Sequence, residues 1–517
     1  MRLGIDVGGT NTDAVIIDDS GNIKAWSKQL TTSNLGETIY ETAKIVLNEA
    51  NVKPESMKGI FLGTTHVLNE LYYPKNLAKT ALIRLTKKPS KIKPGLFWPS
   101  HLSKYIIKEF HLETKYDFTR QIPHYDEIDH ESVFKIMKEL EKAKVESVCI
   151  VGAFSSFYED EENNLKKVIA SHMPSLSVTV SNEIGSIGFL DRENASLLNS
   201  MLSFVMKDAL SSINDIFKNL GLHCPYWITQ NDGSLMKVEE AIKLPIFTIG
   251  SGITNSLRGA SKLTGLKNFI GIDVGGSTID IGMVSHGHPQ TEEGPVKVLD
   301  IPVNVRLPKV HSLSTGGGNL VNTHNGDLLI EDTIASDITK DGLAWGGEQW
   351  TISDSFLKIF PHSFKDKHIK YENLEGISTE DCLKVVNTVS SRIREKIRQL
   401  QPKDQYVPLV LVGGGSPLLL NNIFTKFDKA IQPVGYQICN AVGACYAPLS
   451  SSLDKVFWLN DRTKEEIVER EKERVITELI HKGAKPETIK INRVEEFPFD
   501  YLKGEMFRLK IMAFGDL

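Results

Sequence analysis

LGIDVGGTNTD, from Leu3 to Asp13, decides the fold of this chain, because IGIDVGGSTID repeats its pattern from Ile270 to Asp280. Each copy leads from an apolar run into an aspartate, a Gly-Gly pair, hydroxyl residues and a second aspartate. A short apolar run bounded by glycines is typical of a buried strand. A chain that carries the same loop twice is expected to consist of two related halves that face each other across a ligand.

Both loops have the composition of a phosphate-binding turn. Paired glycines let the backbone turn sharply, and successive backbone N–H groups can then form an anion-binding concavity. Hydroxyl side chains add further donors. The residues expected to hold phosphate groups are Gly8, Gly9, Thr10, Thr12, Gly275, Gly276, Ser277 and Thr278. The alternative for either copy alone is a tight turn without a ligand.

The aspartates of the two copies predict a metal ion beside the phosphates. Asp6, Asp13, Asp273 and Asp280 would repel a bare phosphate. Mg²⁺ takes oxygen ligands and keeps much of its hydration, so it can lie between carboxylate, water and phosphate. The pattern therefore predicts a nucleotide with Mg²⁺ in the cleft between the halves.

A third glycine-rich loop, LVLVGGGSPLL from Leu409 to Leu419, follows the second copy. Its glycines leave room for a planar ring against the backbone, and its Ser-Pro pair also predicts the start of a helix. The residues expected to hold the nucleoside are Gly413, Gly414, Gly415 and Ser416. A fourth run, Ser314–Asn319, is either a flexible turn or part of the same site.

The order and type of these loops resemble the superfamily of acetate and sugar kinases, heat-shock chaperones and actin. In that pattern Leu3–Asp13 is similar to the first phosphate motif, Ile270–Asp280 to the second, and Leu411–Pro417 to the adenosine motif. Cys439–Ala447 (CNAVGACYA) is similar to the small-residue connecting helix about which the lobes hinge, here at Asn440–Ala444.

Within that superfamily the chain resembles the hydantoinase A/5-oxoprolinase family over nearly its whole length. The similar blocks occur in the family's order. They are LGTTHVLNELYY at Leu62–Tyr73, SNEIGSIGFLDRENASLLNSML at Ser181–Leu202, TQNDGSLM at Thr229–Met236, PIFTIGSGITNSLRGA at Pro245–Ala260, and the strands of Val494–Leu517.

Three positions depart from the family pattern. Asn182 stands where the family usually has His, and Phe157–Asp160 replaces an Asn-Pro turn. Thr339–Glu348 stands roughly where the family has a Pro-Gly-Pro-Ala-Cys-Tyr-Gly block. These changes leave the predicted ATP loops intact and bear on the substrate and on any metal that those family residues hold.

The resemblance implies an α/β fold: duplicated actin-like ATPase lobes around a nucleotide cleft, with a small C-terminal α+β extension. It implies an enzyme, an ATP-dependent hydrolase of cyclic amides of the hydantoin or 5-oxoproline type, which phosphorylates the amide carbonyl before ring opening. ATP and Mg²⁺ are the implied cofactors. Asp6 and Asp273 would orient Mg²⁺, Asp13 would act as base or orient water, and Thr64 and Thr65 would contact the substrate.

Two other functions stay open at this stage. A kinase of the same superfamily that acts on a small metabolite would have the same ATP site, and a non-catalytic nucleotide-binding subunit would keep the loops without turnover. The family often adds a B-type hydantoinase subunit, which is a candidate partner; a homo-oligomer is also open.

Composition agrees with a cytoplasmic enzyme. The 517 residues carry a formal net charge of −5, with no basic footprint for nucleic acid. Five scattered cysteines fit neither a disulfide framework nor a zinc pattern and favour a reducing compartment. No apolar run reaches the ~20 residues of a membrane helix, and the N-terminus opens into a strand without a leader. No cysteine has an activated setting, and a structural role is favoured for His66.

The predicted domains are 1–245, 246–449 and 450–517. The first contains an insertion or lid at about 75–135, which is rich in Lys, Pro and aromatic residues. We expect one long helix at Asp191–Leu220 with Asp191 at its cap, a linker at Ser450–Ser452, and a helix at Thr463–His481 before two final strands. Arg258 is expected either to contact phosphate or to face solvent.

Overall fold

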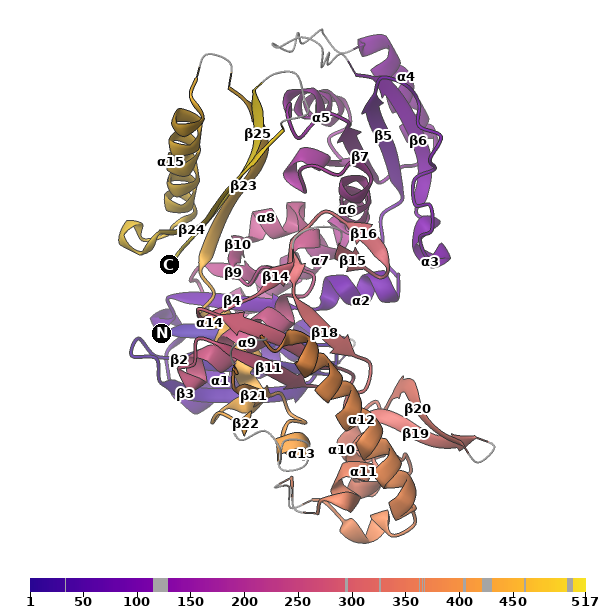
Figure 1. Cartoon of the computed structure of the whole chain (residues 1–517), viewed down its shortest axis with the longest axis vertical. Coiled ribbons are helices and arrows are strands. Elements are labelled where there is room, and N and C mark those ends of the chain that lie inside the picture. The colour runs from indigo at the N-terminus through magenta and orange to yellow at the C-terminus, as the bar shows by residue number, and fades with distance from the viewer. Residues whose placement is uncertain are drawn as a thin grey trace.

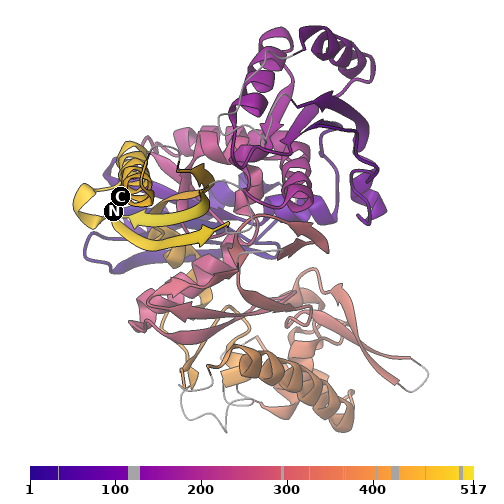
Figure 2. The ribbon, with the colours of Figure 1, turned by 45° about the horizontal axis from the view of Figure 1, so that its top comes forward.

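The computed structural model has two related α/β lobes, with further elements on the side of the first lobe that faces away from the second (Figures 1 and 2). It describes the chain except residues 33, 115–128, 293–295, 325–326, 362, 365, 367, 403–405, 421–429, 460–461 and 500–504. Among the described residues no helix is long and apolar enough to cross a membrane.

The first lobe is built on a nine-stranded sheet that contains strands from both ends of the chain. β1 pairs antiparallel with β2 and parallel with β4. In sheet order the strands are β24 (Lys490–Pro498), β25 (Met506–Gly515), β23 (Leu449–Trp458), β10 (Leu235–Lys237), β9 (Tyr226–Thr229), β4 (Gly59–Thr64), β1 (Arg2–Val7), β2 (Asn11–Ile17) and β3 (Ile23–Leu30). The predicted C-terminal α+β segment therefore extends the sheet of the first lobe.

The second lobe repeats the centre of this sheet. β11 pairs antiparallel with β12 and parallel with β21, as β1 does with β2 and β4. The strands are β13 (His288–Pro289), β12 (Ile279–Ser285), β11 (Phe269–Val274), β21 (Leu409–Val412) and β22 (Ala430–Ile431), with β18 (Val310–Leu313) also paired to β12. Asp6 lies opposite Asp13 in one hairpin and Asp273 opposite Asp280 in the other. The predicted duplication is thus confirmed strand by strand.

Helices cover the two sheets. α1 (Leu35–Ala50), α7 (Ser203–Asn219) and α8 (Val238–Lys243) belong to the first lobe. α11 (Ile352–Ile359) and α12 (Thr379–Leu400) pack together in the second, beside the hairpin of β19 (Asn319–His324) and β20 (Asp327–Ile334). The remaining short elements are α2 (His66–Tyr72), α3 (Ser100–Ser103), α10 (Ile338–Asp341), α13 (Pro417–Leu420), β14 (Thr291–Glu292), β15 (Val296–Val298), β16 (Ile301–Val303) and β17 (Leu307–Pro308).

Two helices pack closely at the junction of the lobes: α9 (Ser251–Thr264) and α14 (Cys439–Cys445). A Cβ on Gly443 would overlap the carbonyl oxygen of Asn255, and one on Gly259 would overlap that of Cys439. A Cβ on Gly4 of β1 would likewise meet the backbone of Ala441. The contacts are backbone against backbone, which only glycine permits.

The predicted insertion at 75–135 is part of a larger unit. β6 (Ile106–Glu113), β5 (Thr80–Thr86), β7 (Ser147–Gly152) and β8 (Ser177–Val180) form a four-stranded parallel sheet with α4 (His130–Lys142) and α5 (Asp160–His172). The ordered unit therefore continues to about residue 180, and 115–128 lie outside the described residues. The domain boundaries otherwise stay a prediction.

Two expectations of local structure are wrong. The predicted helix of Asp191–Leu220 is two helices, α6 (Phe189–Met201) and α7, because the chain breaks at Leu202. The carbonyl of Met201 accepts a hydrogen bond from the N–H of Ala78 (2.8 Å), so a tertiary contact uses the break. Asp191 does not cap the helix: Gly188 holds that position, without a side-chain hydrogen bond.

The predicted linker at Ser450–Ser452 lies inside β23, paired along its length with β25. Three serines resemble a linker by composition, yet here they belong to a strand that packs against its neighbour and against the helix α15 (Lys464–Lys482). This helix confirms the predicted C-terminal helix within a residue at each end. Two final strands follow, as expected.

The packing of α9 on α14 predicts that Gly443→Ala destabilises the fold. The added methyl has no space beside Asn255, and overpacking of this kind costs about 3 kcal/mol. Urea unfolding checks the loss. Gly376→Ala is the matched control, since a Cβ there meets nothing within 4 Å. If both variants unfold at the same urea concentration, the close crossing is wrong.

Candidate functional site

The two repeated loops close with the same hydrogen bond. The N–H of Gly8 donates to the carbonyl of Asn11, and that of Gly275 to the carbonyl of Thr278, both at 2.9 Å. The expectation that all four glycine amides face a ligand is therefore too broad. The groups left to form the anion-binding concavity are the N–H groups of Gly9, Thr10, Gly276 and Ser277.

The fourth glycine run braces the second loop. Gly316, Gly317 and Gly318 donate their N–H groups to the carbonyls of Ser277, Gly275 and Gly276 at 3.2, 3.0 and 2.7 Å. A Cβ on Gly316 would overlap the loop backbone. Of the two alternatives for Ser314–Asn319, the structure supports a role at the site, because the N–H groups of this run bond to the carbonyl groups of the second loop and hold it in place.

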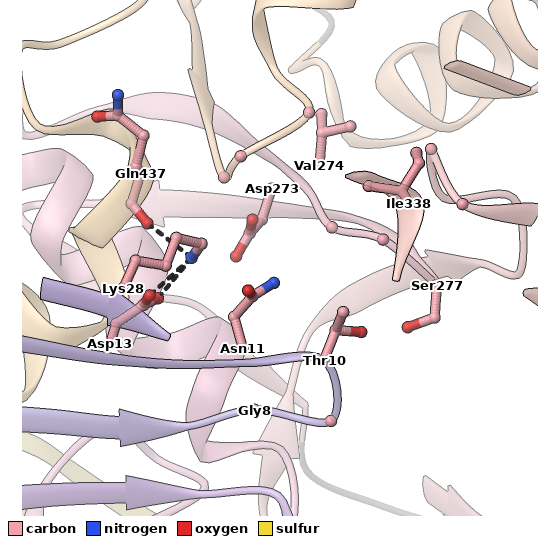
Figure 3. Close-up of a pocket in the computed structure, with 18 of the residues that line it drawn as sticks. Gly8, Thr10, Asn11, Asp13, Lys28, Asp273, Val274, Ser277, Ile338 and Gln437 are labelled. Carbon is pink, nitrogen blue, oxygen red and sulfur yellow. Dashed lines mark hydrogen bonds and ion pairs between the residues drawn. The ribbon is translucent and has the colours of Figure 1, made fainter. Parts of the chain in front are cut away.

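A cavity of about 960 Å³ lies between the lobes where the loops meet (Figure 3). Thr10 and Ser277 face it from the two loops, and Gly413–Gly415 line it from the third. Figure 3 shows Asp13, Asp273 and Lys28 at its wall. The predicted residues brought together here are Gly8, Gly9, Thr10, Asp13, Asp273, Gly275, Gly276, Ser277, Thr278, Gly413, Gly414 and Gly415.

Lys28 is the functional residue that the sequence analysis missed. Its Nζ lies 2.7 and 2.9 Å from the carboxylate oxygens of Asp13 and 3.2 Å from the carbonyl of Gln437. Burial raises the pKa of Asp13, and the charge of Lys28 opposes that rise. Lys28 is the cross-strand neighbour of Asp13 in the β2–β3 hairpin, so the register set by the turn at Asp18–Asn22 could have revealed it.

Asp273 faces the cavity as a buried carboxyl group. Its Oδ2 accepts a hydrogen bond from the hydroxyl of Ser256 at 2.5 Å. Burial raises its pKa from 3.8 to about 6. Asp280 also lines the cavity, accepts hydrogen bonds from the hydroxyls of Ser312 and Thr278, and has a pKa raised by burial.

Asp6 is placed differently from its counterpart Asp273. It is 2% exposed and lies behind the cavity wall, where Asn440 of α14 donates to Oδ2 (2.9 Å) and Asn255 of α9 donates to Oδ1 (3.3 Å). Burial is the largest cause that raises its pKa to about 6. Asn255 and Ser256 are consecutive, so one turn of α9 holds the aspartates of both lobes.

The third loop is shaped by Gly413, whose φ of 84° is the left-handed region that favours glycine. A Cβ there would overlap the carboxylate of Asp273. Ser416 lies outside the cavity lining: its hydroxyl donates to the carbonyl of Gly413 (2.8 Å) and accepts from Gln432 (2.7 Å). Its contribution is to fix the turn that presents the glycines.

Three further predicted residues also lie outside the cavity lining. The hydroxyl of Thr12 lies 3.0 Å from that of Thr31, on the opposite face of β2 from Asp13. Thr64 accepts the N–H of His66 (3.1 Å), and Thr65 donates to the carbonyl of Val7 (3.2 Å). These bonds shape the end of β4, and neither Thr64 nor Thr65 lines the interlobe cavity, so their contact with substrate stays a prediction.

Two residues with open roles are now placed. Burial lowers the pKa of His66, whose side chain is also outside the cavity lining. Arg258 is 4% exposed, so solvent exposure is wrong. Its guanidinium packs against Gly233 and lies outside the lining of the interlobe cavity, so its contact with phosphate stays a prediction. Its pKa is lowered to about 10 by burial.

The chain belongs to the hydantoinase/oxoprolinase family. Residues 2–173 match the family's "Hydantoinase/oxoprolinase N-terminal region", and residues 192–452 match "Hydantoinase/oxoprolinase". The fold and the duplicated loops described above are therefore those of a member of this family, as the sequence resemblance indicated.

The relatives named below are distant in sequence. The chain is 24% identical to an uncharacterised protein of Methanocaldococcus jannaschii, over 100% of this chain and 82% of the relative. It is 22% identical to the acetone carboxylase beta subunit of Xanthobacter autotrophicus, over 91% of this chain and 72% of that subunit. The structure of ATP-dependent caprolactamase from Pseudomonas jessenii superposes with a TM-score of 0.77 at 16% identity, covering 100% of this chain and 88% of that chain. That likeness confirms the fold.

The Asp13–Lys28 pair predicts that Lys28→Met costs about 2 kcal/mol of unfolding free energy, because it leaves a buried carboxylate unpaired. The double variant Lys28→Met/Asp13→Asn should recover part of that loss. A double-mutant cycle from urea melts measures the coupling. Additive effects of the two changes would contradict the pairing.

The raised pKa of Asp273 predicts a pH-dependent gain for Asp273→Asn. Between its ordinary pKa of 3.8 and its folded value of about 6, the folded protein holds more protons than the unfolded chain, so this group makes stability fall as pH rises. The variant should be about 3 kcal/mol more stable at pH 7, and this gain should disappear as the pH falls below 3.8.

Asp18→Asn is the control, for which we expect a change in unfolding free energy of the opposite sign. Hydrogen bonds from Asn22 lower the pKa of Asp18 to about 2, so its charged form stabilises the fold and its removal should cause a loss at pH 7. Melts across the pH range report both variants. A pH-independent effect of Asp273→Asn would show that Asp273 is not the buried acid described here.

Proposed function

We propose that this protein is an ATP-dependent hydrolase of small cyclic amides of the hydantoin or 5-oxoproline type. The observation that carries the proposal is the interlobe cavity, where two copies of one loop bring backbone donors and buried carboxylates to the same space in a member of the hydantoinase/oxoprolinase family. The similar caprolactamase is an ATP-dependent enzyme, which supports ATP as the cofactor.

The cavity fits a nucleotide in one orientation. Gly9, Thr10, Gly276 and Ser277 present the donors for phosphate groups. The glycines of the third loop and the neighbouring Tyr436 offer an open wall for the base and sugar. We therefore assign the phosphates to the paired loops and the nucleoside to Gly413–Gly415.

The carboxylates fit Mg²⁺ in the same space. Asp13, Asp273 and Asp280 line the cavity with Lys28 as the cation paired to one of them, so the site carries an excess of buried negative charge. Among the described residues no group of three His, Cys, Asp or Glu side chains is placed to hold a metal. Asp273 would thus offer a ligand within a shell made mainly of water and phosphate, which is how Mg²⁺ binds. Bound there, Mg²⁺ would neutralise charge on the phosphates.

The reaction proposed here activates an unreactive carbonyl. The amide oxygen attacks the γ-phosphorus and ADP leaves. Water then adds to the activated carbon, and the ring C–N bond breaks as the ring nitrogen takes a proton. A second water attacks the carbon of the resulting acyl phosphate, so phosphate leaves with the former carbonyl oxygen and a carboxylate remains. Asp13, paired with Lys28, is suited to orient the attacking water. Positioning and charge stabilisation supply most of such catalysis.

A second subunit is part of the proposal. The acetone carboxylase beta and caprolactamase alpha proteins are named as subunits, and the sequence matches cover 91% and 69% of this chain. The predicted contacts Thr64 and Thr65 lie outside the cavity, so the ring-opening half has less support in this chain than the ATP half. We infer that the ATP step takes place here and that a B-type subunit completes ring opening.

The test follows labelled γ-phosphate from ATP with hydantoin and with 5-oxoproline, with the chain alone and with a B-type subunit added. We expect free labelled phosphate in step with the ring-opened product, and a fall of about 100-fold or more in that rate for Asp273→Asn. Glu131→Gln, which removes an exposed charge paired with Lys135 on α4, is the control variant. Label that stays on a metabolite hydroxyl would establish a kinase instead, and nucleotide binding without any substrate-stimulated turnover would establish a binding subunit.

A further inference from the structure

One stretch of the first lobe is basic throughout and has no part in the nucleotide site. Between Leu71 and Lys108 the sequence carries nine Lys and Arg residues and no Asp or Glu, in a chain whose formal net charge is −5. No residue of this stretch lines the interlobe cavity. A local charge opposite in sign to that of the whole chain indicates a surface that meets an anionic partner.

A strained turn in this stretch exposes a phenylalanine. The N–H of Trp98 donates to the carbonyl of Gly95 (3.0 Å), which makes Phe97 the third residue of a four-residue turn. The φ of Phe97 is 66°, in the left-handed region where such a turn normally has glycine. Its side chain is 95% exposed. Phe97 thus costs the fold backbone strain, and a side chain this exposed gains almost nothing from packing in return.

The turn has a rigid support. The indole N–H of Trp98 donates to Oδ1 of Asn194 on α6 (3.2 Å), and both Trp98 and Leu102 of α3 pack in the core of the first lobe. Figure 1 shows α3, which follows the turn, at the outer margin of the molecule. Leu96 is 51% exposed beside Phe97. The turn therefore presents two apolar side chains that are already held in position, which lowers the entropy cost of binding.

Two more aromatic side chains lie next to α3. Nε2 of His101 is 3.2 Å from the carbonyl oxygen of Leu71, so α3 contacts the end of α2. Tyr72 and Tyr73 follow directly and are 51% and 75% exposed. Aromatic rings with a polar tip favour a boundary between an apolar and an aqueous phase. The exposed side chains near α3 therefore have the composition of an interfacial surface.

Exposed lysines precede the turn along the chain. Among the described residues, the ion pairs of this stretch belong to Arg84 and Lys108. The guanidinium of Arg84 also donates to the carbonyl of Ile92 (2.7 Å), which attaches the lysine-bearing loop to β5. The lysines that have no carboxylate partner among the described residues are Lys87, Lys88, Lys91 and Lys93.

The chemistry of these side chains favours a lipid surface over a protein. Lysine is depleted in protein–protein interfaces, where arginine is enriched, and the exposed cations before the turn are all lysines. Anionic headgroups attract lysines without a matched partner for each of them. The long lysine stems also let the ammonium groups stay in water while apolar neighbours are buried. A protruding apolar tip needs no preformed pocket at a membrane surface.

We propose that this surface binds an anionic membrane, with Phe97 and Leu96 in the headgroup layer and the lysines against lipid phosphates. We call it the membrane face, and it consists of Tyr72, Tyr73, Lys87, Lys88, Lys91, Lys93, Leu96 and Phe97. The lining of the interlobe cavity contains no residue between Leu30 and Ser256, so the membrane face and the nucleotide site share no residue.

Sedimentation with lipid vesicles tests the proposal. The protein is mixed with vesicles of phosphatidylcholine alone, or of phosphatidylcholine with about one third phosphatidylserine. We expect binding to the anionic vesicles that is at least about tenfold stronger than binding to the neutral ones. This binding should weaken as salt is added, because salt screens the attraction between lysines and headgroups.

Phe97→Gly separates binding from folding. Glycine adopts a φ of 66° without strain, so the variant should fold as the parent does and bind anionic vesicles about tenfold more weakly. Val434→Ala is the matched control, since Val434 is also 95% exposed but follows β22 in the second lobe, and binding should be unchanged. The double variant Lys91→Gln/Lys93→Gln should bind about tenfold more weakly and with less dependence on salt.

Three results with vesicles would overturn the proposal: no binding to either kind, equal binding to both kinds, or unchanged binding of Phe97→Gly. A fourth comes from a B-type subunit. If the protein bound that subunit instead of vesicles, and Phe97→Gly weakened the binding, the face would be a protein contact. These assays contain neither ATP nor an amide, so their outcome is independent of the hydrolase proposal.

Discussion

The site depends on one helix turn that holds the acidic groups of both lobes. Asn255 and Ser256, consecutive in α9, bond to Asp6 and Asp273. They can do so because α9 and α14 touch through glycine, at Gly259 and Gly443. A side chain at either position would separate the helices and with them the two loops. The small residues at this crossing thus fix the distance between the halves of the phosphate site.

The acidic groups of the cavity give this geometry a cost in folding free energy. Burial raises the pKa of Asp273 and of Asp280, and a single lysine offsets one of their neighbours. Such carboxylates destabilise the free protein at neutral pH, because their charge is poorly solvated. In the proposed function, a cation bound with the nucleotide phosphates would relieve that repulsion.

The sequence predicted those parts of the fold that depend on neighbours along the chain. The repeated loops and the helix α15 follow from local pattern, and the hairpin register could have identified Lys28. Contacts between segments far apart in the sequence could not be predicted from local pattern. At the break at Leu202, the carbonyl of Met201 accepts a hydrogen bond from the N–H of Ala78. The serines of β23 form a strand because β25 pairs with them.

The nine-stranded sheet has a consequence for how this chain reaches its fold. β1 and β2 are synthesised before the second lobe, yet β23 and β25 join the same sheet from beyond residue 448. Until they are made, the sheet ends at β10, a three-residue strand, and the apolar face of β4 around Phe61 lacks its cover from α14. An open edge with an apolar face invites wrong pairing. The sheet of the first lobe therefore stays incomplete while the whole second lobe is synthesised. This topology requires that the open sheet edge be protected from wrong pairing during that interval.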